Sequence, residues 1–282
     1  MLVNMKELLK KAQDGGYAVG SFSVANMEMI LGVIKAAEEM HSPIILQIAE
    51  VRLNHSPLKI IGPCMLAAAE NASVPVAVHL DHGTTAECIK EALALGFTSV
   101  MFDGSHLPFE ENVARTKEVV ALAKEYGAAT EAEIGCVGGS EDGSEDIAMR
   151  CTSPSQAKEF YEKTGVDALA IAIGNAHGFY KDAPELRFDI LEAVSETVPV
   201  PLVLHGGTGI EPEDFIKCHQ KGIKKINIAT ATFAACESKV REGYEKGEIK
   251  GYYDLHQKEI SGAYENAKKH IEIFWSQNKA NL

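Results

Sequence analysis

Three histidines in the sequence stand beside glycines at the ends of short apolar runs. They are His82 in HLDHG, His177 in GNAHG and His205 in LHGGTG. Three imidazole ligands with an open fourth position form the coordination shell of a catalytic Zn²⁺. A single histidine in such a place is more often held by a local hydrogen bond, but three in equivalent places favour a metal site. The other seven are expected to be structural or exposed, namely His41, His55, His79, His106, His219, His256 and His270.

Acidic side chains end the same kind of apolar run. Asp81 precedes the first of the three histidines, Asp103 lies in MFDGSH, and the segment EAEIG carries Glu131 and Glu133. A carboxylate held beside a reacting group can take up or deliver a proton. These residues are therefore candidates for acid–base work or for a second metal position.

A long acidic, glycine-rich segment, GCVGGSEDGSEDIAMRC, follows the fifth apolar run and contains Glu141. Long loops in compact domains are usually functional lids or disordered segments. We expect residues 135–149 to form a lid that is mobile alone and ordered over bound substrate, because they have little apolar area to bury. The neighbouring acidic residues leave open a second interpretation, in which Glu141 is only a solvated loop residue.

The segment HGGTGI predicts an anion site. Gly206 and Gly207 allow backbone N–H groups to approach a phosphate, and the helix expected in EPEDFIKC would add the partial positive charge of its N-terminus. Thr208 in the same segment, and Asn227 and Thr230 in KINIAT, offer further donors. An ordinary glycine-rich turn is the alternative interpretation.

The elements that would position these residues alternate along the whole chain. Eight apolar runs, each continuous as in strands buried on both faces, are followed by helical patterns. They cover residues 17–24, 43–49, 75–82, 99–103, 128–134, 168–173, 201–205 and 225–229. Thr84 and Ser153 are expected helix caps. Eight such units predict an α/β fold, a (β/α)8 TIM barrel, forming a single domain over residues 1–282 with a C-terminal helical extension at 252–278.

The barrel fold explains why the candidate residues belong together. Catalytic side chains of such barrels lie at the C-terminal ends of the strands, and phosphate often binds after the seventh and eighth strands. A doubly wound sheet would place a glycine-rich turn after the first strand, where SFSVANME has none. Lys224 and Lys225 are expected to precede the eighth strand, at the opposite end of the barrel from the site.

Composition restricts the partners. The formal net charge of the 282-residue chain is −13, which opposes binding to nucleic acid or to an anionic membrane. No apolar run reaches the roughly 18 residues that a membrane span needs. The six cysteines form no CxxC pair, and the first residues resemble an amphipathic helix rather than an export signal. We expect a soluble cytoplasmic protein with reduced thiols.

The combined motifs resemble those of the class II, metal-dependent ketose-bisphosphate aldolases. HLDHG, SVMFDGSHLPFEEN, EAEIGCVGGSEDG, AIGNAHGFY, PLVLHGGTG and KINIAT occur in the order and spacing of that family over nearly the whole chain. The resemblance implies reversible cleavage of a phosphorylated ketose such as fructose or tagatose 1,6-bisphosphate, with Zn²⁺ as cofactor. It also implies a homodimer or homotetramer.

The resemblance assigns roles to individual residues. It implies that His82, His177 and His205 hold the zinc ion and that Asp81 acts on the C4 oxygen of the substrate. A second or alternative metal position would lie near Asp103 and Glu133, and Glu141 would handle the C3 proton. A monovalent cation (Na⁺ or K⁺) and the phosphate of the dihydroxyacetone half would be held by Gly178, Gly206, Gly207, Thr208, Asn227 and Thr230.

Ala229 departs from the pattern of many fructose-cleaving relatives, which carry aspartate there, and resembles tagatose-type relatives. The sugar therefore stays open, including another phosphorylated ketose.

Three other functions are weighed against a class II aldolase. A Schiff-base aldolase needs a desolvated lysine at a strand end, and a hydrolase barrel usually carries an HxH pair on its first strand. The sequence offers neither. A non-catalytic accessory barrel would have no reason to keep all the candidate catalytic groups together.

Overall fold

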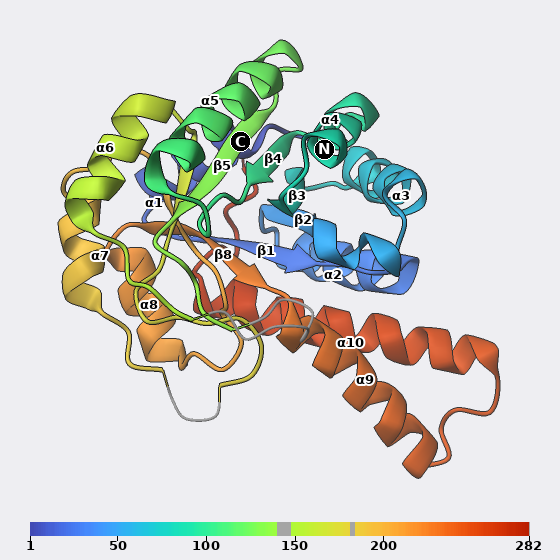
Figure 1. Cartoon of the computed structure of the whole chain (residues 1–282). Coiled ribbons are helices and arrows are strands. Elements are labelled where there is room, and N and C mark those ends of the chain that lie inside the picture. The colour runs from blue at the N-terminus through green and yellow to red at the C-terminus, as the bar shows by residue number, and fades with distance from the viewer. Residues whose placement is uncertain (140–147, 181–183, 282) are drawn as a thin grey trace.

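Eight parallel strands close into a barrel in the order of the sequence, so that β1 pairs with both β2 and β8 (Figure 1). The computed structural model describes residues 1–139, 148–180 and 184–281. The strands are β1 Val19–Ser23, β2 Ile44–Ala49, β3 Val76–Gly83, β4 Ser99–Phe102, β5 Ala129–Ile134, β6 Ala168–Ile171, β7 Leu202–Leu204 and β8 Ile223–Ile228. Every strand residue is buried, which accounts for the continuous apolar runs. The expected (β/α)8 barrel is confirmed.

Helices alternate with the strands and cover the outside of the barrel (Figure 1). They are α1 Met5–Gly15, α2 Met27–Glu39, the 3-10 helix η1 Glu50–Asn54, α3 Leu58–Asn71, α4 Ala86–Leu95, α5 Phe109–Glu125, α6 Pro154–Thr164, α7 Phe188–Ser195, α8 Pro212–Gln220, α9 Thr230–Glu245 and α10 Tyr252–Ile273. Among the described residues, no helix is both long and apolar enough to cross a membrane.

One of the two expected helix caps is wrong. The N-cap of α4 is Thr85, whose hydroxyl accepts a hydrogen bond from the backbone N–H of Cys88, at 3.3 Å. The backbone N–H of Thr84 instead donates to the carboxylate of Glu50, at 2.6 Å. Ser153 is the N-cap residue of α6, as expected, although its side chain makes no capping hydrogen bond. Residue type favours a cap at both places, but the backbone geometry determines which residue takes the position.

Helix α1 closes the N-terminal end of the barrel. Its apolar face, which includes Leu8 and Leu9, is wholly buried. That face forms one cluster with residues from the first half of the strands, among them Val19, Ile45 and Ala77. The lower barrel is therefore a packed core, and a functional site has room only toward the C-terminal ends of the strands.

Helices α9 and α10 lie side by side and project from the barrel (Figure 1). Helix α10 packs on both α9 and α2, and its last residues return to the barrel, where the Phe274 and Phe215 rings meet edge to face. The large side chains of Tyr244, Tyr252 and Tyr253 stay exposed near the far end of this pair.

The eighth strand begins earlier than the sequence pattern predicts. Lys224 and Lys225 lie inside β8 rather than before it. Both side chains are buried. The expectation that both precede the strand is wrong, because two lysines interrupt the apolar run that marks it. Lys224 lies on the outer face near the start of β8, whereas Lys225 contacts Glu131 and Asn227 inside the barrel.

Candidate active site

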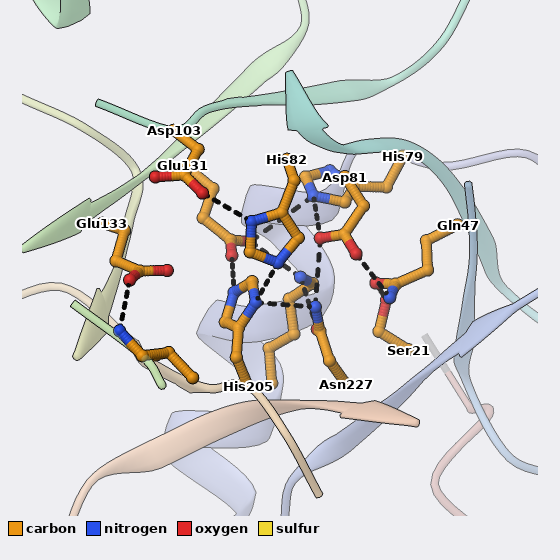
Figure 2. Close-up of polar contacts among 12 residues, drawn as sticks. Ser21, Gln47, His79, Asp81, His82, Asp103, Glu131, Glu133, His205 and Asn227 are labelled. Carbon is orange, nitrogen blue, oxygen red and sulfur yellow. Dashed lines mark hydrogen bonds and ion pairs between the residues drawn. The ribbon is translucent and has the colours of Figure 1, made fainter. Parts of the chain in front are cut away.

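The three histidines predicted as metal ligands lie together at the C-terminal end of the barrel, and Figure 2 shows two of them, His82 and His205, facing each other. The ring centroid of His82 is 4.9 Å from that of His177 and 4.6 Å from that of His205. Each ring offers a nitrogen atom, and these nitrogens all lie within 4.8 Å of one another. His82 lies near the end of β3, His205 directly follows β7, and His177 lies in the loop after β6.

His82 is held in an unusual backbone conformation. Its φ angle is +42°, and the register between β3 and β4 shifts between Leu80 and Gly83. A left-handed conformation costs a residue with a Cβ atom about 1–2 kcal/mol. Such strain is retained where the surrounding structure enforces it, which is common at functional sites. The shift ends the regular strand and directs the ring of His82 toward His205.

A carboxylate stands behind two of the three imidazoles. His82 Nδ1 lies 2.7 Å from Asp103 Oδ2, and His205 Nε2 donates a hydrogen bond to Glu131 Oε1 at 2.9 Å. Burial alone would raise the pKa of Asp103, but the hydrogen bond and charge of His82 lower it below its ordinary value. The carboxylates leave His82 Nε2 and His205 Nδ1 to face each other, 2.8 Å apart.

The imidazoles of His177 and His205 are suited to bind a metal ion because burial favours their neutral forms. Burial and the nearby His82 lower the pKa of His177 to about 3, and the same causes place the pKa of His205 well below its usual value. Neutral imidazoles backed by carboxylates are ligands that Zn²⁺ prefers, and such carboxylates fix the tautomer and ring orientation. The residues present therefore fit a divalent metal of this class.

Asp81 is buried between two amide donors. Its Oδ1 accepts from Asn227 Nδ2 at 3.0 Å, and its Oδ2 accepts from Gln47 Nε2 at 2.9 Å. The Gln47 side-chain oxygen in turn accepts a hydrogen bond from the hydroxyl of Ser21. Sequence reasoning missed Gln47, although a lone polar residue in the apolar strand IILQIA is a signal that could have found it.

Glu133 is a buried carboxyl close to His82 and Asp103, and the three could hold a metal ion together. Its Oε1 accepts a hydrogen bond from the backbone N–H of Val137 at 2.9 Å. Burial, followed by the charge of Asp103, raises the pKa of Glu133 to about 8. Glu141, which was predicted together with Asp81 as a catalytic residue, lies outside the described residues.

A small pocket beside the histidines gathers the predicted phosphate-binding residues. It is lined by His177, Gly178, Gly206, Gly207, Thr208, Asn227, Ala229 and Thr230. At Gly206 a Cβ atom would lie 2.1 Å from the carbonyl oxygen of Ala176, so only glycine fits this approach. The bordering helix N-terminus belongs to α9 rather than to the expected α8, and the backbone N–H of Ala231 donates to Thr208 Oγ1 at 3.0 Å.

Lys225 and His79 belong to a layer directly beneath the site that sequence reasoning did not identify. Lys225 Nζ lies 2.9 Å from Glu131 Oε2 and donates to Asn227 Oδ1 at 2.7 Å. His79 Nδ1 lies 2.9 Å from the hydroxyl of Ser99. These residues lie inside the strands, where a charged or polar residue in an apolar run is the signal.

Comparison with known proteins gives a consistent result over the whole chain. Residues 3–279 match the family model "Fructose-bisphosphate aldolase class-II". A Staphylococcus aureus protein named fructose-bisphosphate aldolase is 44% identical over 246 residues, which are 86% of this chain and 85% of that protein.

Solved structures agree with the sequence comparisons. The crystal structure of the YdjI aldolase from Escherichia coli K12 has a TM-score of 0.90 and 37% identity, with all of both chains covered. The fructose-bisphosphate aldolase from Campylobacter jejuni has a TM-score of 0.81 and 25% identity, and the match covers 99% of this chain and 97% of that one. The family is metal-dependent, as the clustered histidines and carboxylates lead one to expect. This chain belongs to the class II fructose-bisphosphate aldolase family, whose members are lyases that break carbon–carbon bonds.

Proposed function

We propose that the protein catalyses the reversible, Zn²⁺-dependent cleavage of a ketose 1,6-bisphosphate to dihydroxyacetone phosphate and glyceraldehyde 3-phosphate. The observation that carries the proposal is the convergence of His82, His177 and His205 beside both a buried carboxylate and a glycine-lined pocket. Cleavage needs a Lewis acid for the ketone, a base for the C4 hydroxyl and a holder for the phosphate. The metal ion held by the histidines would be the Lewis acid, Asp81 the base and the pocket the phosphate site.

The metal ion, when bound by the three histidines, would polarise the C2 carbonyl and stabilise the negative charge that cleavage leaves on the dihydroxyacetone half. Asp81 takes the proton from the C4 hydroxyl as the C3–C4 bond breaks. Gln47 and Asn227 donate to its two oxygens and hold the carboxylate toward that hydroxyl. Glu141 returns a proton to C3, a role supported by its place in the family motif.

The phosphate of the dihydroxyacetone half is proposed to bind in the pocket beside His177. Backbone N–H groups at Gly206 and Gly207, the side chains of Thr208 and Thr230, and the N-terminus of α9 offer donors there. A monovalent cation near Gly178 would offset part of the phosphate charge. Asn227 also lines this pocket, but its amide is engaged by Asp81 and Lys225, so its proposed contribution is to the reacting end.

The alanine at position 229 favours the proposal that the protein accepts a second substrate besides fructose 1,6-bisphosphate. It lines the pocket without a polar side chain, so it cannot fix the hydroxyl that distinguishes the two C4 epimers. A site without such a partner discriminates weakly between epimers. Tagatose 1,6-bisphosphate is therefore proposed as a competent substrate.

The active protein is proposed to be a cytoplasmic homodimer or homotetramer. The exposed tyrosines of the α9–α10 pair, Tyr244, Tyr252 and Tyr253, are aromatic side chains of the kind enriched at protein interfaces. The cysteines are free in the described residues, as in a reducing compartment.

The decisive experiment compares cleavage rates on fructose 1,6- and tagatose 1,6-bisphosphate, with Zn²⁺ and with a chelator. Release of dihydroxyacetone phosphate is followed with a coupled dehydrogenase. We expect turnover of both sugars, lost with the chelator and restored by Zn²⁺. Zinc-loaded protein that cleaves neither sugar but cleaves another ketose phosphate would redirect the proposal to that ketose. Protein that binds zinc and cleaves no phosphorylated ketose would instead be an accessory barrel.

A further inference from the structure

The two adjacent lysines of β8 lie on opposite faces of the strand. Lys225 is wholly buried, and its ammonium group contacts Glu131 and Asn227 inside the barrel. Lys224 donates to the backbone carbonyl of His219 in α8, at 2.7 Å, on the outer face. A buried ammonium ion is costly unless it is paired, so the contacts of Lys225 require an explanation.

We propose that Lys225 is a positioning residue, which sets the hydrogen-bonding direction of both Glu131 and Asn227 and so presents His205 to the metal and a donor to Asp81. The inference rests on the proposed metal site at the three histidines. It predicts that Lys225 affects metal affinity through Glu131, which lies between Lys225 and His205.

Lys225 acts on His205 through Glu131. Its Oε2 faces Lys225 Nζ at 2.9 Å, and its Oε1 lies 2.9 Å from His205 Nε2. An ammonium group has donors only, so Oε2 accepts from it, and this contact fixes the orientation in which Oε1 accepts a hydrogen bond from His205. The proton of the neutral His205 ring is then on Nε2, and the Nδ1 lone pair is left facing His82.

Lys225 acts on Asp81 through Asn227. An ammonium group has donors only, so the amide must turn its oxygen toward Lys225, at 2.7 Å. Its Nδ2 group then lies 3.0 Å from Asp81 Oδ1 and donates to it. A flipped amide would place an oxygen against that carboxylate. Lys225 thus determines which end of Asn227 meets the catalytic base.

Two other interpretations of Lys225 make different predictions. A Schiff-base nucleophile needs a neutral amine, whereas this ammonium is paired with a carboxylate at 2.9 Å. A purely structural ion pair would affect folding and leave the bound metal unchanged. Metal binding by the folded variants therefore separates positioning from structure.

The test uses metal affinity of the full-length protein, measured with Zn²⁺ in competition with a chelator, and the visible spectrum of the Co²⁺-loaded protein. Lys225→Met should weaken Zn²⁺ binding about 10–100-fold and change the Co²⁺ spectrum, because its loss removes the contact that holds Glu131 in place against His205. Lys224→Met is the matched control. It removes a neighbouring buried lysine from the outer face and should leave both readouts unchanged.

A reciprocal variant sharpens the test. Glu131→Gln should also weaken Zn²⁺ binding, because Lys225 would hold the amide oxygen and turn the amide nitrogen toward His205. In the double variant with Lys225→Met, the amide is free to reverse and accept from His205. Metal affinity should then recover to within about 10-fold of the parent protein, although each single change costs more.

The outcomes separate the inference from the proposed function. If folded Lys225→Met protein has the Zn²⁺ affinity and the Co²⁺ spectrum of the wild type, the inference alone is overturned. Equal losses of Zn²⁺ affinity in Lys224→Met and Lys225→Met would also overturn it. So would a double variant that binds Zn²⁺ no more tightly than the single variants. If Lys225→Met fails to fold, Zn²⁺ affinity is compared between the Glu131→Gln variant and the double variant. Recovery of affinity in the double variant supports the inference, and no recovery overturns it. Wild-type protein that binds no divalent metal would overturn both the inference and the proposed function.

Discussion

His205 Nδ1 lies 2.8 Å from His82 Nε2, although the two residues are 123 positions apart in the chain. The other nitrogen of each ring faces a carboxylate, Asp103 behind His82 and Glu131 behind His205. The two imidazoles therefore point their remaining nitrogens at one place from opposite sides of the barrel. That relationship makes the proposed metal ligands the most direct subject for experiment.

Replacing His177 with alanine should remove tight metal binding without unfolding the protein. The ring lies at the rim beside a glycine-lined pocket, so its loss removes coordination rather than core packing. We expect a fall in turnover of about three orders of magnitude or more. Metal content, circular dichroism and the cleavage assay measure the effect. His106→Ala, which changes an exposed histidine after β4, is the control, and a His177 variant with stoichiometric zinc and normal turnover would refute the assignment.

Asp81 and Glu141 should have separable roles. Glu141→Ala should suppress exchange of the C3 proton of dihydroxyacetone phosphate with solvent, whereas Asp81→Asn should lower cleavage more than that exchange. Proton exchange in deuterated water and the cleavage rate are measured on the same preparations. Equal losses of both activities in the two variants would contradict this division of labour.

The strained backbone at His82 predicts an unusual order of stability. In metal-free protein, His82→Gly should be about 1–2 kcal/mol more stable than His82→Ala, because glycine adopts a φ of +42° without the cost of a Cβ atom. Urea unfolding measures the difference. The same pair of changes at His205, which has no positive φ, should give the ordinary order with alanine more stable. An identical order at both positions would show that His82 carries no strain.

Glu133 predicts a pH-dependent stability in metal-free protein. Its pKa is raised by burial and by Asp103 to about 8, so the folded state retains a proton that the unfolded state loses near pH 4.5. Its contribution is present at low pH and is lost as the pH rises from about 4.5 to 8. Glu133→Gln should therefore gain roughly 1–3 kcal/mol relative to the parent between pH 5 and pH 8. A difference between the two proteins that stays constant over this range would contradict the raised pKa.

Ala229 predicts modest selectivity between the C4 epimers. The difference in kcat/KM between fructose and tagatose 1,6-bisphosphate should lie within about 1–3 kcal/mol. Ala229→Asp should shift the preference toward fructose by supplying a carboxylate for the hydroxyl. Ala231→Asp, two residues further along α9, is a control for added charge. A preference for fructose above a thousandfold in the unmodified protein would place the specificity in other residues.

The barrel and the three histidines could be predicted because both depend on features visible along the chain. Continuous apolar runs predict parallel strands, and the C-terminal ends of such strands converge, so His82 and His205 could be brought together without a structure. Gln47 and Lys225 could not be assigned roles, because their partners Asp81 and Glu131 belong to other strands, and the contacts depend on register and side-chain direction. The residues that line the small pocket were predicted as a group, but the helix N-terminus beside them was not, since α9 begins without a recognisable capping residue.

The packing of α1 against the first residues of the strands restricts where substrate can enter and products can leave. With that end filled by residues such as Leu8 and Leu9, entry and departure are confined to the opposite end, above the histidines. One ketose must enter there, and two shorter molecules must leave by the same route. Any segment that covers this opening during bond cleavage to keep water out also delays the departure of the products. Exclusion of water and release of product are thus two outcomes of a single movement, and neither can be accelerated without affecting the other.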